Sequence, residues 1–561
     1  MTTTEQAPAP AAGPAGPPPR RGTRRLLAAL TGLLAAAVGL GVAELGAALI
    51  GPGASPVVAV GDAVITLTPE PVKAFAIAAF GESDKVALVV GTLVLTALYA
   101  LGLGVVSLRS RRVGVAGILL FGLLGAVAAA TRPAGNEFAA LPSLLGAAAG
   151  AAALRALLAP LSSAATAAPP AAGPAVPPST PPADAAVVER LREVLAAGDR
   201  KGAGLDRRRF FLTSGVAVGA AVLTGGGGLL LRRRFDVSGA RSDLALPEPG
   251  SPAAPLPRGA DLAPQVDGLT PLFTPNRDFY RVDTAIAVPQ ISPAGYRLRV
   301  TGMVESPRTY TLEDLFSRDD LIERDITLTC VSNEVGGTLA GTARWLGVPL
   351  GAFLRENGVS SRSDQLVCRS SDGMTIGAPT RSALEVEDAM LAFGMNGEPL
   401  PVEHGFPVRM LIPGLYGYVS ACKWLTEIEA TTFDAFDAYW VQRGWAATGP
   451  IKVAARIDTP APLRRFPAGP RAVAGVAWAQ TRGIARVEVR VDDGEWREAD
   501  LSPEVDADVW RQWVLRHDFA PGSYQLTVRA TTADGEVQTE ERARPFPSGA
   551  TGLHSIRVIA T

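Results

Sequence analysis

The chain has 561 residues and a formal net charge of −1, so its length suggests three or four folding units and its charge gives no reason to expect nucleic acid as a partner. It contains only three cysteines, which argues against a disulfide framework. Two Ala/Pro-rich stretches, near residues 5–19 and 159–183, hold too few large apolar side chains to bury a core, and we expect both to be disordered.

The first third of the chain has the pattern of a membrane region. A helix needs about 20 apolar residues to cross a bilayer, and four nearly uncharged apolar runs are long enough. These runs cover residues 26–50, 86–108, 113–131 and 139–159. We therefore predict a disordered cytoplasmic N-terminus over residues 1–25 and four transmembrane helices within residues 26–159.

Basic residues beside the runs predict their orientation, because Lys and Arg accumulate on the cytoplasmic side. The cluster Arg20–Arg25 puts the N-terminus in the cytoplasm, and Arg109, Arg111 and Arg112 mark a second cytoplasmic turn. The segment between the first two runs then lies outside, and the chain returns to the cytoplasm after Leu158. This region has no His or Cys and no Met after the initiator, so we expect neither haem nor an iron–sulfur cluster in it.

A Pro/Ala-rich cytoplasmic linker is expected over residues 160–205, followed by a distinctive segment over residues 206–234. Paired arginines, Arg207 and Arg208, precede a Phe pair and a weakly apolar, Gly-rich run, which resembles a twin-arginine export signal at an internal position. We expect this segment to stay as an anchor helix, so that the chain after it is extracytoplasmic. An ordinary fifth span is the alternative. In both readings arginines 232–234 would lie on the outer side, which conflicts with the preference of basic residues for the cytoplasmic side.

The remaining chain divides into a linker, expected over residues 235–261, and two folded parts. Residues 262–449 mix short apolar runs with Gly and Pro. Tyr296–Val300 alternates as a half-buried strand should, and Leu312–Phe316 reads as a helical turn. We therefore predict an α+β domain in this part.

Residues 450–561 have a different pattern. Val487, Val489 and Val491 alternate with charged residues and lead into Asp493-Gly494, which is a hairpin turn signal. The same pattern returns before Asp534-Gly535. Short strands at this spacing predict an immunoglobulin-like β-sandwich. The complete fold class is thus an α-helical transmembrane region, then an α+β domain, then a β-sandwich.

Cys330 follows the strand-like lead Thr327–Thr329 and precedes Asn333 and the pair Gly336-Gly337, which allow a tight turn. A thiolate on such a loop is a soft ligand for a transition metal. Taken alone this signal is weak, since most free cysteines are small buried hydrophobes.

The neighbouring motifs strengthen the interpretation of Cys330. They are Asn276-Arg277-Asp278-Phe279-Tyr280, Asn396-Gly397-Glu398-Pro399-Leu400-Pro401, His404-Gly405-Phe406-Pro407-Val408-Arg409, Pro413-Gly414 and Lys423-Trp424-Leu425. In this order and spacing they closely resemble the sulfite-oxidase family of molybdenum enzymes, which includes periplasmic methionine-sulfoxide reductases. The resemblance runs from about Leu262 to the C-terminus and implies a catalytic domain followed by an immunoglobulin-like dimerisation domain.

The resemblance implies a molybdenum–molybdopterin cofactor with Cys330 as the protein ligand of the metal. It implies that His404 and Arg409 bind the pterin and its phosphate, for which the planar fork of Arg is well suited. Further cofactor contacts are implied for Asn276, Tyr280, Asp372, Ala421, Cys422 and Lys423. Without the resemblance, His404 reads as a turn cap and Lys423 as a solvated charge. Cys368 lies in a strand-like run and reads as a core residue.

The sequence departs from true sulfite oxidases at their cationic anion pocket. An Arg expected five residues after the ligand Cys is Val335, and an Arg-Asn-His run aligns with Val282, Asp283 and Thr284. Arg281 could compensate only if its loop shifts. The Tyr expected near the active site is Trp445, which we count with Cys330 as a catalytic candidate. Sulfite is a dianion that would lose charged hydrogen bonds at roughly 1.5–3 kcal/mol each, so we expect a neutral or partly apolar substrate.

These features predict a multi-pass protein of the cell membrane with an extracytoplasmic oxidoreductase domain that performs oxygen-atom transfer. Reduction of a sulfoxide or similar oxo-compound is the leading hypothesis, and oxidation of a small substrate, including sulfite, is the rival. Expected partners are a small-molecule substrate, a separate redox partner, membrane lipid and a second copy bound through the C-terminal domain. An inactive membrane-tethered scaffold or adhesion protein of the same fold is the alternative from another class.

Overall fold

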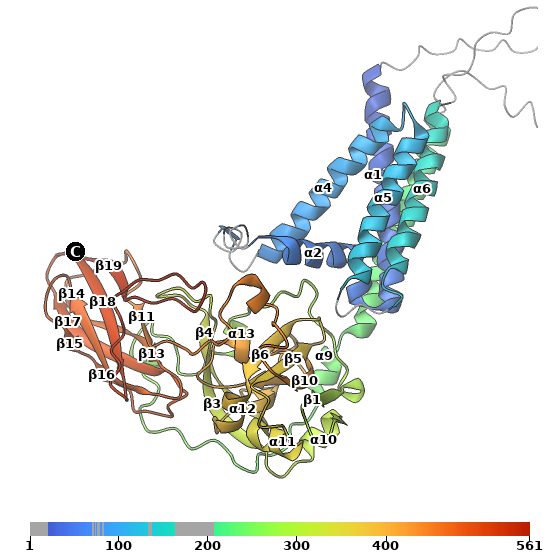
Figure 1. Cartoon of the computed structure of the whole chain (residues 1–561). Coiled ribbons are helices and arrows are strands. Elements are labelled where there is room, and N and C mark those ends of the chain that lie inside the picture. Colours follow the sequence, from blue (N-terminus) through green and yellow to red (C-terminus); the bar gives the residue numbers. More distant parts are fainter. Residues whose placement is uncertain are drawn as a thin grey trace, which may run out of the picture. The chain divides into compact units, whose positions relative to one another are not determined.

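The structure is a computed structural model, and it describes residues 21–69, 72, 75, 79–80, 84–132, 137–162 and 207–561. Residues 1–20 of the expected N-terminal tail and residues 163–205 of the expected cytoplasmic linker lie outside the described residues. The chain forms two compact units, Met1–Arg234 and Phe235–Thr561 (Figure 1). Each unit is described separately below.

The first unit is helical. Its helices are α1 (Arg21–Ile50), α2 (Pro56–Leu67), α4 (Asp84–Val106), α5 (Arg111–Ala130), α6 (Leu141–Ser162) and α8 (Arg207–Arg232). Among the described residues, five helices are long and apolar enough to cross a membrane, and α2 is a shorter apolar helix. Each run predicted as a span is therefore helical. The sequence pattern did not predict α2, which begins at Ser55, where the hydroxyl accepts a hydrogen bond from the Val58 amide.

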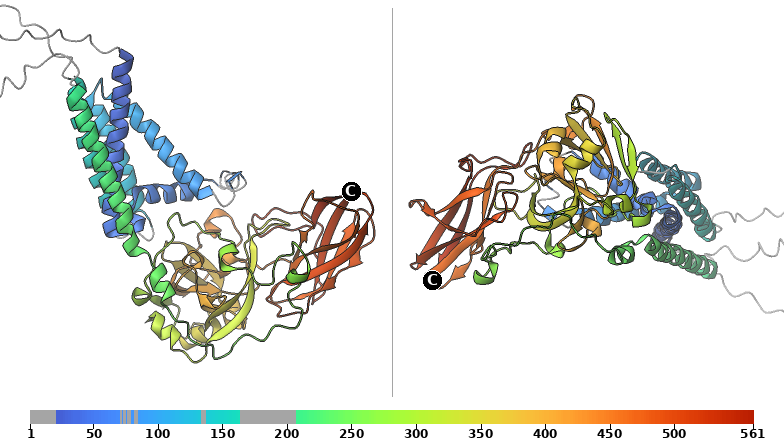
Figure 2. Two further views of the ribbon diagram at one scale, coloured as in Figure 1. Left: turned by 180° about the vertical axis from the view of Figure 1, so that it is seen from behind. Right: turned by 90° about the horizontal axis from the view of Figure 1, so that it is seen from below.

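Helix α1 is the centre of this unit and packs against α4, α6 and α8 (Figure 2). Glycine makes these contacts close: a Cβ on Gly32 would lie 2.0 Å from the Ala100 carbonyl oxygen, and one on Gly146 would lie 2.5 Å from the Gly39 carbonyl oxygen. Close backbone approach at small residues is the usual packing mode of helices that have no hydrophobic driving force between them, as in a bilayer.

The arginines after α8 have local partners. Arg232 forms an ion pair with Glu44 of α1, and Arg234 donates to the Leu49 carbonyl oxygen. Val38 and Ala217 share one apolar cluster, as do Ala28 and Phe210, so α1 and α8 run in parallel. The ends of both helices thus lie together, and Glu44 offsets one of the charges that conflict with the charge rule.

The second unit begins with two sheets that carry the predicted α+β region. One has the order β3-β4-β7-β8, with β9 beside β7, and the other has the order β2-β1-β10-β5-β6. The strands are β1 (Leu298–Gly302), β2 (Arg308–Tyr310), β3 (Ile322–Thr329), β4 (Ala340–Pro349), β5 (Gln365–Ser370), β6 (Thr375–Pro379), β7 (Met390–Met395), β8 (Glu398–Pro399), β9 (Arg409–Leu411) and β10 (Leu425–Thr431). The short helices are α9 (Ser238–Ser242), α10 (Leu312–Phe316), α11 (Leu350–Glu356), α12 (Thr380–Glu385) and α13 (Gly417–Ser420).

The C-terminal part is a sandwich of two sheets, β11-β13-β17-β16 and β12-β19-β18-β14-β15. Its strands are β11 (Ala454–Thr459), β12 (Arg465–Phe466), β13 (Gly469–Trp478), β14 (Ile484–Val491), β15 (Arg497–Glu498), β16 (Asp500–Leu501), β17 (Arg511–Phe519), β18 (Gly522–Thr532) and β19 (His554–Ala560). Side chains of both sheets, among them Val487 and Trp513, share one buried core. The predicted turn at Asp493-Gly494 joins β14 to β15, which pair antiparallel.

The segment over residues 235–261, expected as a linker, contacts the folded part of the second unit. Arg241 of α9 donates to the carbonyl oxygens of Pro399 and Leu400 at 2.5 and 2.8 Å, and Ser251 forms a β-bridge with Ile322. This segment is therefore part of the second unit. The composition of the segment did not predict these contacts, because they are hydrogen bonds to backbone carbonyl groups, which no sequence pattern marks.

Candidate active site

Cys330 is the first residue after β3, in the loop that connects β3 to its antiparallel partner β4. The Cys330 amide donates to the Leu339 carbonyl oxygen at 2.9 Å, and Asn333 Oδ1 accepts from the Leu339 amide at 2.9 Å. Gly336 has φ +81°, and a Cβ there would lie 2.2 Å from the His554 ring. The predicted tight turn is thus present, and it holds the Cys330 thiol in a buried position.

Burial raises the pKa of the Cys330 thiol, while the Ser332 amide, 3.4 Å from Sγ, and the charge of Lys423 act in the opposite direction. A thiol in such a place needs a strong positive charge nearby to ionise fully. A bound metal cation supplies that charge, so this environment suits a metal ligand.

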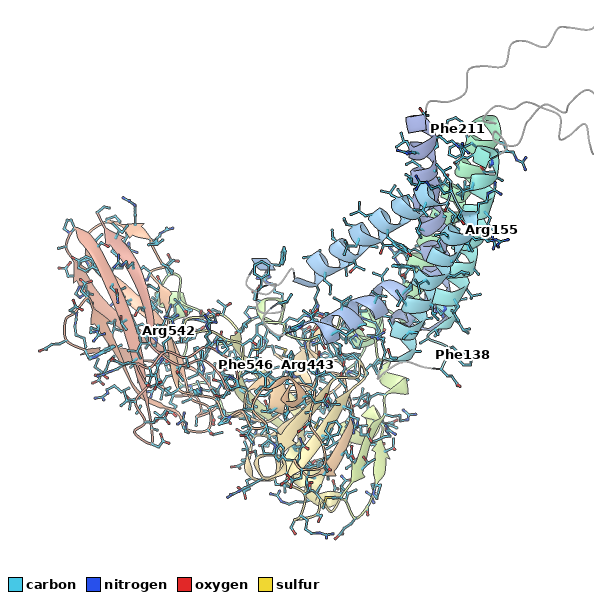
Figure 3. All side chains as sticks on the ribbon, turned by 45° about the horizontal axis from the view of Figure 1, so that its top comes forward. Phe138, Arg155, Phe211, Arg443, Arg542 and Phe546 are labelled. Carbon is cyan, nitrogen blue, oxygen red and sulfur yellow. The ribbon has the colours of Figure 1, made fainter. Side chains whose placement is uncertain are left out.

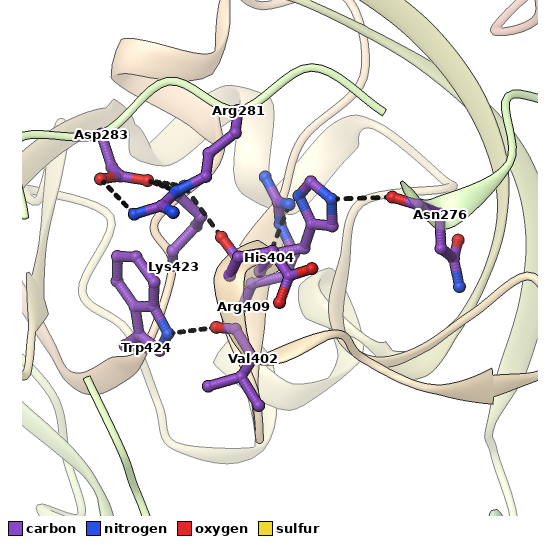
Figure 4. Close-up of polar contacts among 9 residues, drawn as sticks. Asn276, Arg281, Asp283, Val402, His404, Arg409, Lys423 and Trp424 are labelled. Atoms are coloured by element: carbon purple, nitrogen blue, oxygen red, sulfur yellow. Dashed lines mark hydrogen bonds and ion pairs between the residues drawn. The ribbon is translucent and has the colours of Figure 1, made fainter. Parts of the chain in front are cut away.

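His404 ends the turn before β9, Arg409 is the first residue of β9, and the two side chains lie close together (Figure 4). Gly405 between them has φ +115°, and a Cβ there would lie 3.1 Å from the Lys423 Cα, so the close approach of the two loops requires Gly. His404 Nε2 donates to the Asn276 carbonyl oxygen at 3.2 Å, and Arg409 donates to the His404 carbonyl oxygen at 3.0 Å. Burial and the charges of Arg409 and Lys423 lower the pKa of His404 to about 3, which leaves its ring neutral.

Arg409 is 5% exposed, and burial lowers its pKa to about 10, so it still carries a charge at neutral pH. Its Nε is buried and has no hydrogen-bond partner among the described residues. A buried guanidinium with an unused donor is costly unless an anion binds there. Such a donor fits the phosphate of a pterin cofactor.

Lys423 forms a buried ion pair with Asp283, with Nζ and Oδ2 2.7 Å apart. The same carboxylate binds Arg281 at 2.8 Å, and Lys423 also donates to the Glu403 carbonyl oxygen at 3.2 Å (Figure 4). Burial lowers the pKa of Lys423 to about 8 in spite of this partner. The expected role of Arg281 as a substitute cation is therefore weakened, because Asp283 already occupies its side chain.

The other residues implied by the resemblance lie around this centre. Asn276 donates to Glu398 Oε1 at 2.6 Å and accepts from Asn396, whose φ of 53° forms the turn before β8. Tyr280 is half-buried, and desolvation of its hydroxyl and the nearby Cys330 raise the pKa of that hydroxyl. These contacts join the Asn276 segment to the Asn396-Gly397 motif.

Cys422 belongs to the large apolar core of the second unit, whereas Ala421 lies in the cluster that also contains Phe279 and Phe406. The Cys422 side chain therefore packs in the core and not with the polar groups. Asp372 Oδ1 accepts from the Met374 amide at 3.0 Å in the β5–β6 turn. Burial, followed by the nearby Cys368 and the charge of Asp372, raises the pKa of Cys422.

A hollow lies beside the loop that follows Cys330 and is lined by that loop and by the C-terminal sandwich. It measures about 400 Å³ with the space at its open side included, and its lining includes Val335, Tyr416 and Lys452, whereas Cys330 itself is not part of the lining. Lys452 Nζ donates to the Gly549 carbonyl oxygen at 2.7 Å. Glu334 lies in the same lining, which therefore contains one carboxylate and one ammonium group. Nothing in the local sequence marks Lys452 as a lining residue, and the sequence did not predict that Asp283, which aligns with the basic run of sulfite oxidases, pairs with Lys423.

Trp445 shares a buried apolar cluster with Val331 and Tyr416. Its ring lies 5.3 Å from that of Phe546, which Figure 3 labels together with Arg443. Trp445 is 7% exposed, and its Nε1 has no hydrogen-bond partner among the described residues. An oxygen acceptor of a bound molecule would satisfy this donor.

Comparison with known proteins agrees with the geometry. The family model described as oxidoreductase molybdopterin binding domain matches residues 285–440, which include Cys330, His404, Arg409 and Lys423. Mitochondrial sulfite oxidase of Mus musculus is 30% identical over 319 residues, or 48% of this chain and 57% of that protein. Nitrate reductase [NADH] of Solanum lycopersicum is 27% identical over 317 residues, or 45% of this chain and 35% of that protein.

Among solved structures, the sulfane dehydrogenase SoxCD from Paracoccus pantotrophus aligns with a TM-score of 0.45 and 24% identity, covering 50% of this chain and 80% of that chain. That likeness is too low to carry an argument. The chain spans little more than half the length of the mouse relative. Residues 285–440 thus match an oxidoreductase molybdopterin binding domain, and about half of the chain is similar to sulfite oxidases and nitrate reductases, which supports a sulfite-oxidase-type molybdenum–pterin oxidoreductase.

Proposed function

We propose that this chain is a membrane-anchored, extracytoplasmic molybdenum–pterin enzyme that transfers an oxygen atom and acts on a neutral sulfoxide or a similar small oxo-compound rather than on sulfite. The observation that carries the proposal is the composition of the hollow beside the Cys330 loop. Val335 lines this hollow at the position where sulfite oxidases would have Arg, and the lining also contains the oppositely charged Lys452 and Glu334. Such a lining favours a substrate without net charge.

The residues that would hold the cofactor fit it. Cys330 would bind the metal, while Arg409, His404 and the Lys423 loop would bind the pterin and its phosphate. When bound, the molybdenum–pterin group supplies a two-electron centre for oxygen-atom transfer. The protein contributes the buried positive charge of Arg409, the neutral ring of His404 and the exclusion of water by the surrounding core.

Trp445 supports the proposed class of substrate. Its buried Nε1–H is available as a donor, and a sulfoxide oxygen is a good acceptor. The aromatic rings of Trp440, Tyr418 and Phe546 lie 5.3 to 6.2 Å from the Trp445 ring, measured between centroids. This apolar environment would favour a substrate with apolar substituents on sulfur.

Membrane anchoring is supported by the five long apolar helices of the first unit. The parallel course of α1 and α8 agrees with a cytoplasmic start and an extracytoplasmic end for both. A separate redox partner would exchange electrons with the site, and the C-terminal sandwich would carry an immunoglobulin-like dimer contact. Oxidation of a small substrate is the rival direction, since one relative of this chain is named for sulfite oxidation, whereas another is named for nitrate reduction.

Metal analysis of the purified full-length protein is the first test, with the inactive scaffold as the rival. About one molybdenum per chain is expected, and its absence after expression with ample cofactor would support the scaffold. The second test is a substrate screen with a dye as electron donor. We expect turnover of a neutral dialkyl or aryl sulfoxide. Turnover confined to sulfite, with the dye as acceptor, would contradict the proposal.

A further inference from the structure

The helical unit contains an apolar cavity with a polar group at one end. The cavity encloses about 870 Å³, including the space at its open side, between α1, α2, α4, α5 and α6. Along α1 its lining runs from Gly32 to Ala43, which corresponds to about 16 Å at a rise of about 1.5 Å per residue. This length accommodates an extended hydrocarbon tail.

Ser143 lies at one end of the cavity lining, near Pro56 and Gly125. It is 3% exposed, and its Oγ has no hydrogen-bond partner among the described residues. The other lining hydroxyls differ: those of Thr92, Thr96 and Tyr99 donate to the carbonyl oxygens of Leu88, Thr92 and Gly117. An unpaired buried hydroxyl costs about 1–3 kcal/mol, which a ligand oxygen would recover.

The lining contains no charged residue. A phospholipid head group would leave its phosphate without a cation there, so a ligand with a neutral oxygen fits better. Tyr99 and Phe121 line the cavity as a stacked pair, with centroids 5.6 Å apart and ring planes at 28°. Such a pair favours contact with a flat ring in addition to the tail.

We propose that this cavity binds a prenyl quinone, with a ring carbonyl oxygen accepting a hydrogen bond from Ser143 and the tail lying along α1. The choice of a quinone over other neutral lipids rests on the proposed function. Reduction of one sulfoxide by one quinol balances, because it yields one sulfide, one quinone and one water. The S–O bond and two O–H bonds of the quinol break, sulfur gains two electrons, and the oxygen leaves as water with the two quinol protons.

The test uses the full-length protein in lipid nanodiscs and a photoreactive azido-quinone with a decyl tail, with labelled peptides identified by mass spectrometry. We expect labelling of peptides from α2, α5 or α6, which contribute Pro56, Gly125 and Ser143 to the end of the cavity where the ring would lie. Decylubiquinone should compete, whereas dioleoylglycerol should not. Equal competition by dioleoylglycerol would mean a general lipid groove and would overturn the proposal, as would labelling confined to other segments.

Variants sharpen this test. Ala36→Phe places a ring in the cavity and should reduce labelling at least tenfold, whereas Leu120→Phe, on an exposed face of α5, should not. Ser143→Ala should weaken decylubiquinone competition about 5- to 10-fold, as expected for one hydrogen bond. Unchanged competition in Ser143→Ala would refute the assigned contact. The Cys330→Ser protein should label normally, so a failure of the catalytic proposal would be distinguishable from a failure of this one.

Discussion

Lys423 and Asp283, 140 positions apart in the chain, form an ion pair of 2.7 Å in which both side chains are largely buried. Asp283 also neutralises Arg281, so one carboxylate serves two cations at the edge of the cofactor site. Sulfite oxidases would present a basic run at this position. An acid at this position therefore lowers the local positive charge and occupies both Arg281 and Lys423.

Asp283→Asn should destabilise the second unit by about 2–4 kcal/mol, because it leaves Lys423 and Arg281 without their shared anion in a buried setting. Urea unfolding followed by tryptophan fluorescence would measure the change. Asp320→Asn is the matched control, since Asp320 pairs with Arg318 at 2.7 Å but is 39% exposed, and should cost at most about 1 kcal/mol. Equal losses of unfolding free energy in both variants would show that the buried Lys423–Asp283 pair stabilises the protein no more than the Arg318–Asp320 pair does.

Cys330→Ser should abolish molybdenum-dependent turnover while leaving the fold largely intact, because a hard alkoxide replaces a soft thiolate. Turnover with a reduced dye and the molybdenum content per chain are the measurements. Cys368→Ser is the control: its thiol lies 3.4 Å from the Met410 sulfur in the apolar core and should leave specific activity per molybdenum near normal. Most of the activity surviving in Cys330→Ser would remove the assignment of the metal ligand.

Replacing both Arg207 and Arg208 by Lys should block export of the folded catalytic unit if the segment that begins α8 acts as a twin-arginine signal. Protease added to spheroplasts reports the location of the unit directly. The control replaces Arg232 and Arg233 at the other end of α8 by Lys, which retains their charge. Digestion of the unit from outside in the Arg207/Arg208 variant would instead identify α8 as an ordinary span.

The Cys330 turn and the Asn396-Gly397 turn could be predicted, because residues adjacent in sequence determine them. The roles of Asp283 and Lys452 could not be predicted, because both depend on contacts between distant parts of the chain. Asp283 pairs with Lys423, 140 residues away, and Lys452 donates to the Gly549 carbonyl oxygen in a loop of the sandwich. The contacts of residues 235–261 could not be predicted for the same reason, because Arg241 donates to carbonyl groups of β8 and its neighbour. Helix α2 was missed because its apolar run is shorter than a membrane span.

Asp508 provides a test of stability against pH. Burial, followed by the nearby carboxylates of Asp506 and Asp388, raises the pKa of Asp508 to about 7, although the Thr481 amide donates to it at 2.7 Å. Because the folded pKa lies above the unfolded one, this group's favourable contribution is complete below about pH 4 and is lost as the pH rises toward 7 and above.

Asp508→Asn should therefore raise the free energy of unfolding at pH 8 by about 1–4 kcal/mol and should flatten its dependence on pH between about 4 and 8. Asn retains the acceptor for Thr481. Chemical denaturation at a series of pH values measures the effect. Asp364→Asn, whose Oδ1 accepts from the Phe433 amide on the surface, is the control and should not flatten the curve. A variant that is less stable than the unmodified protein at pH 8 would contradict the raised pKa.

The hollow beside the Cys330 loop should not function as a sulfite pocket. A dianion that enters a partly desolvated site needs cationic partners. Val335 carries no charge, Arg281 is paired with Asp283, and Lys452 shares the lining of the hollow with the carboxylate of Glu334. We expect weak sulfite turnover by the unmodified protein and activity on neutral sulfoxides that improves with apolar bulk.

Val335→Arg should lower the KM for sulfite about tenfold or more, as expected for one charge-assisted hydrogen bond of about 1.5–3 kcal/mol, and should reduce activity on the sulfoxide. Val335→Leu enlarges the side chain without adding charge and should leave the KM for sulfite unchanged, which separates charge from bulk. Trp445→Phe keeps the apolar ring but removes the buried N–H, and should reduce sulfoxide turnover without improving sulfite turnover. The measurement is dye-coupled turnover with molybdenum content determined for each variant. Efficient turnover at micromolar sulfite by the unmodified protein, with its molybdenum site full, would overturn this account of the pocket, because Val335, Arg281 and Lys452 would then have to bind a dianion that their charges do not match.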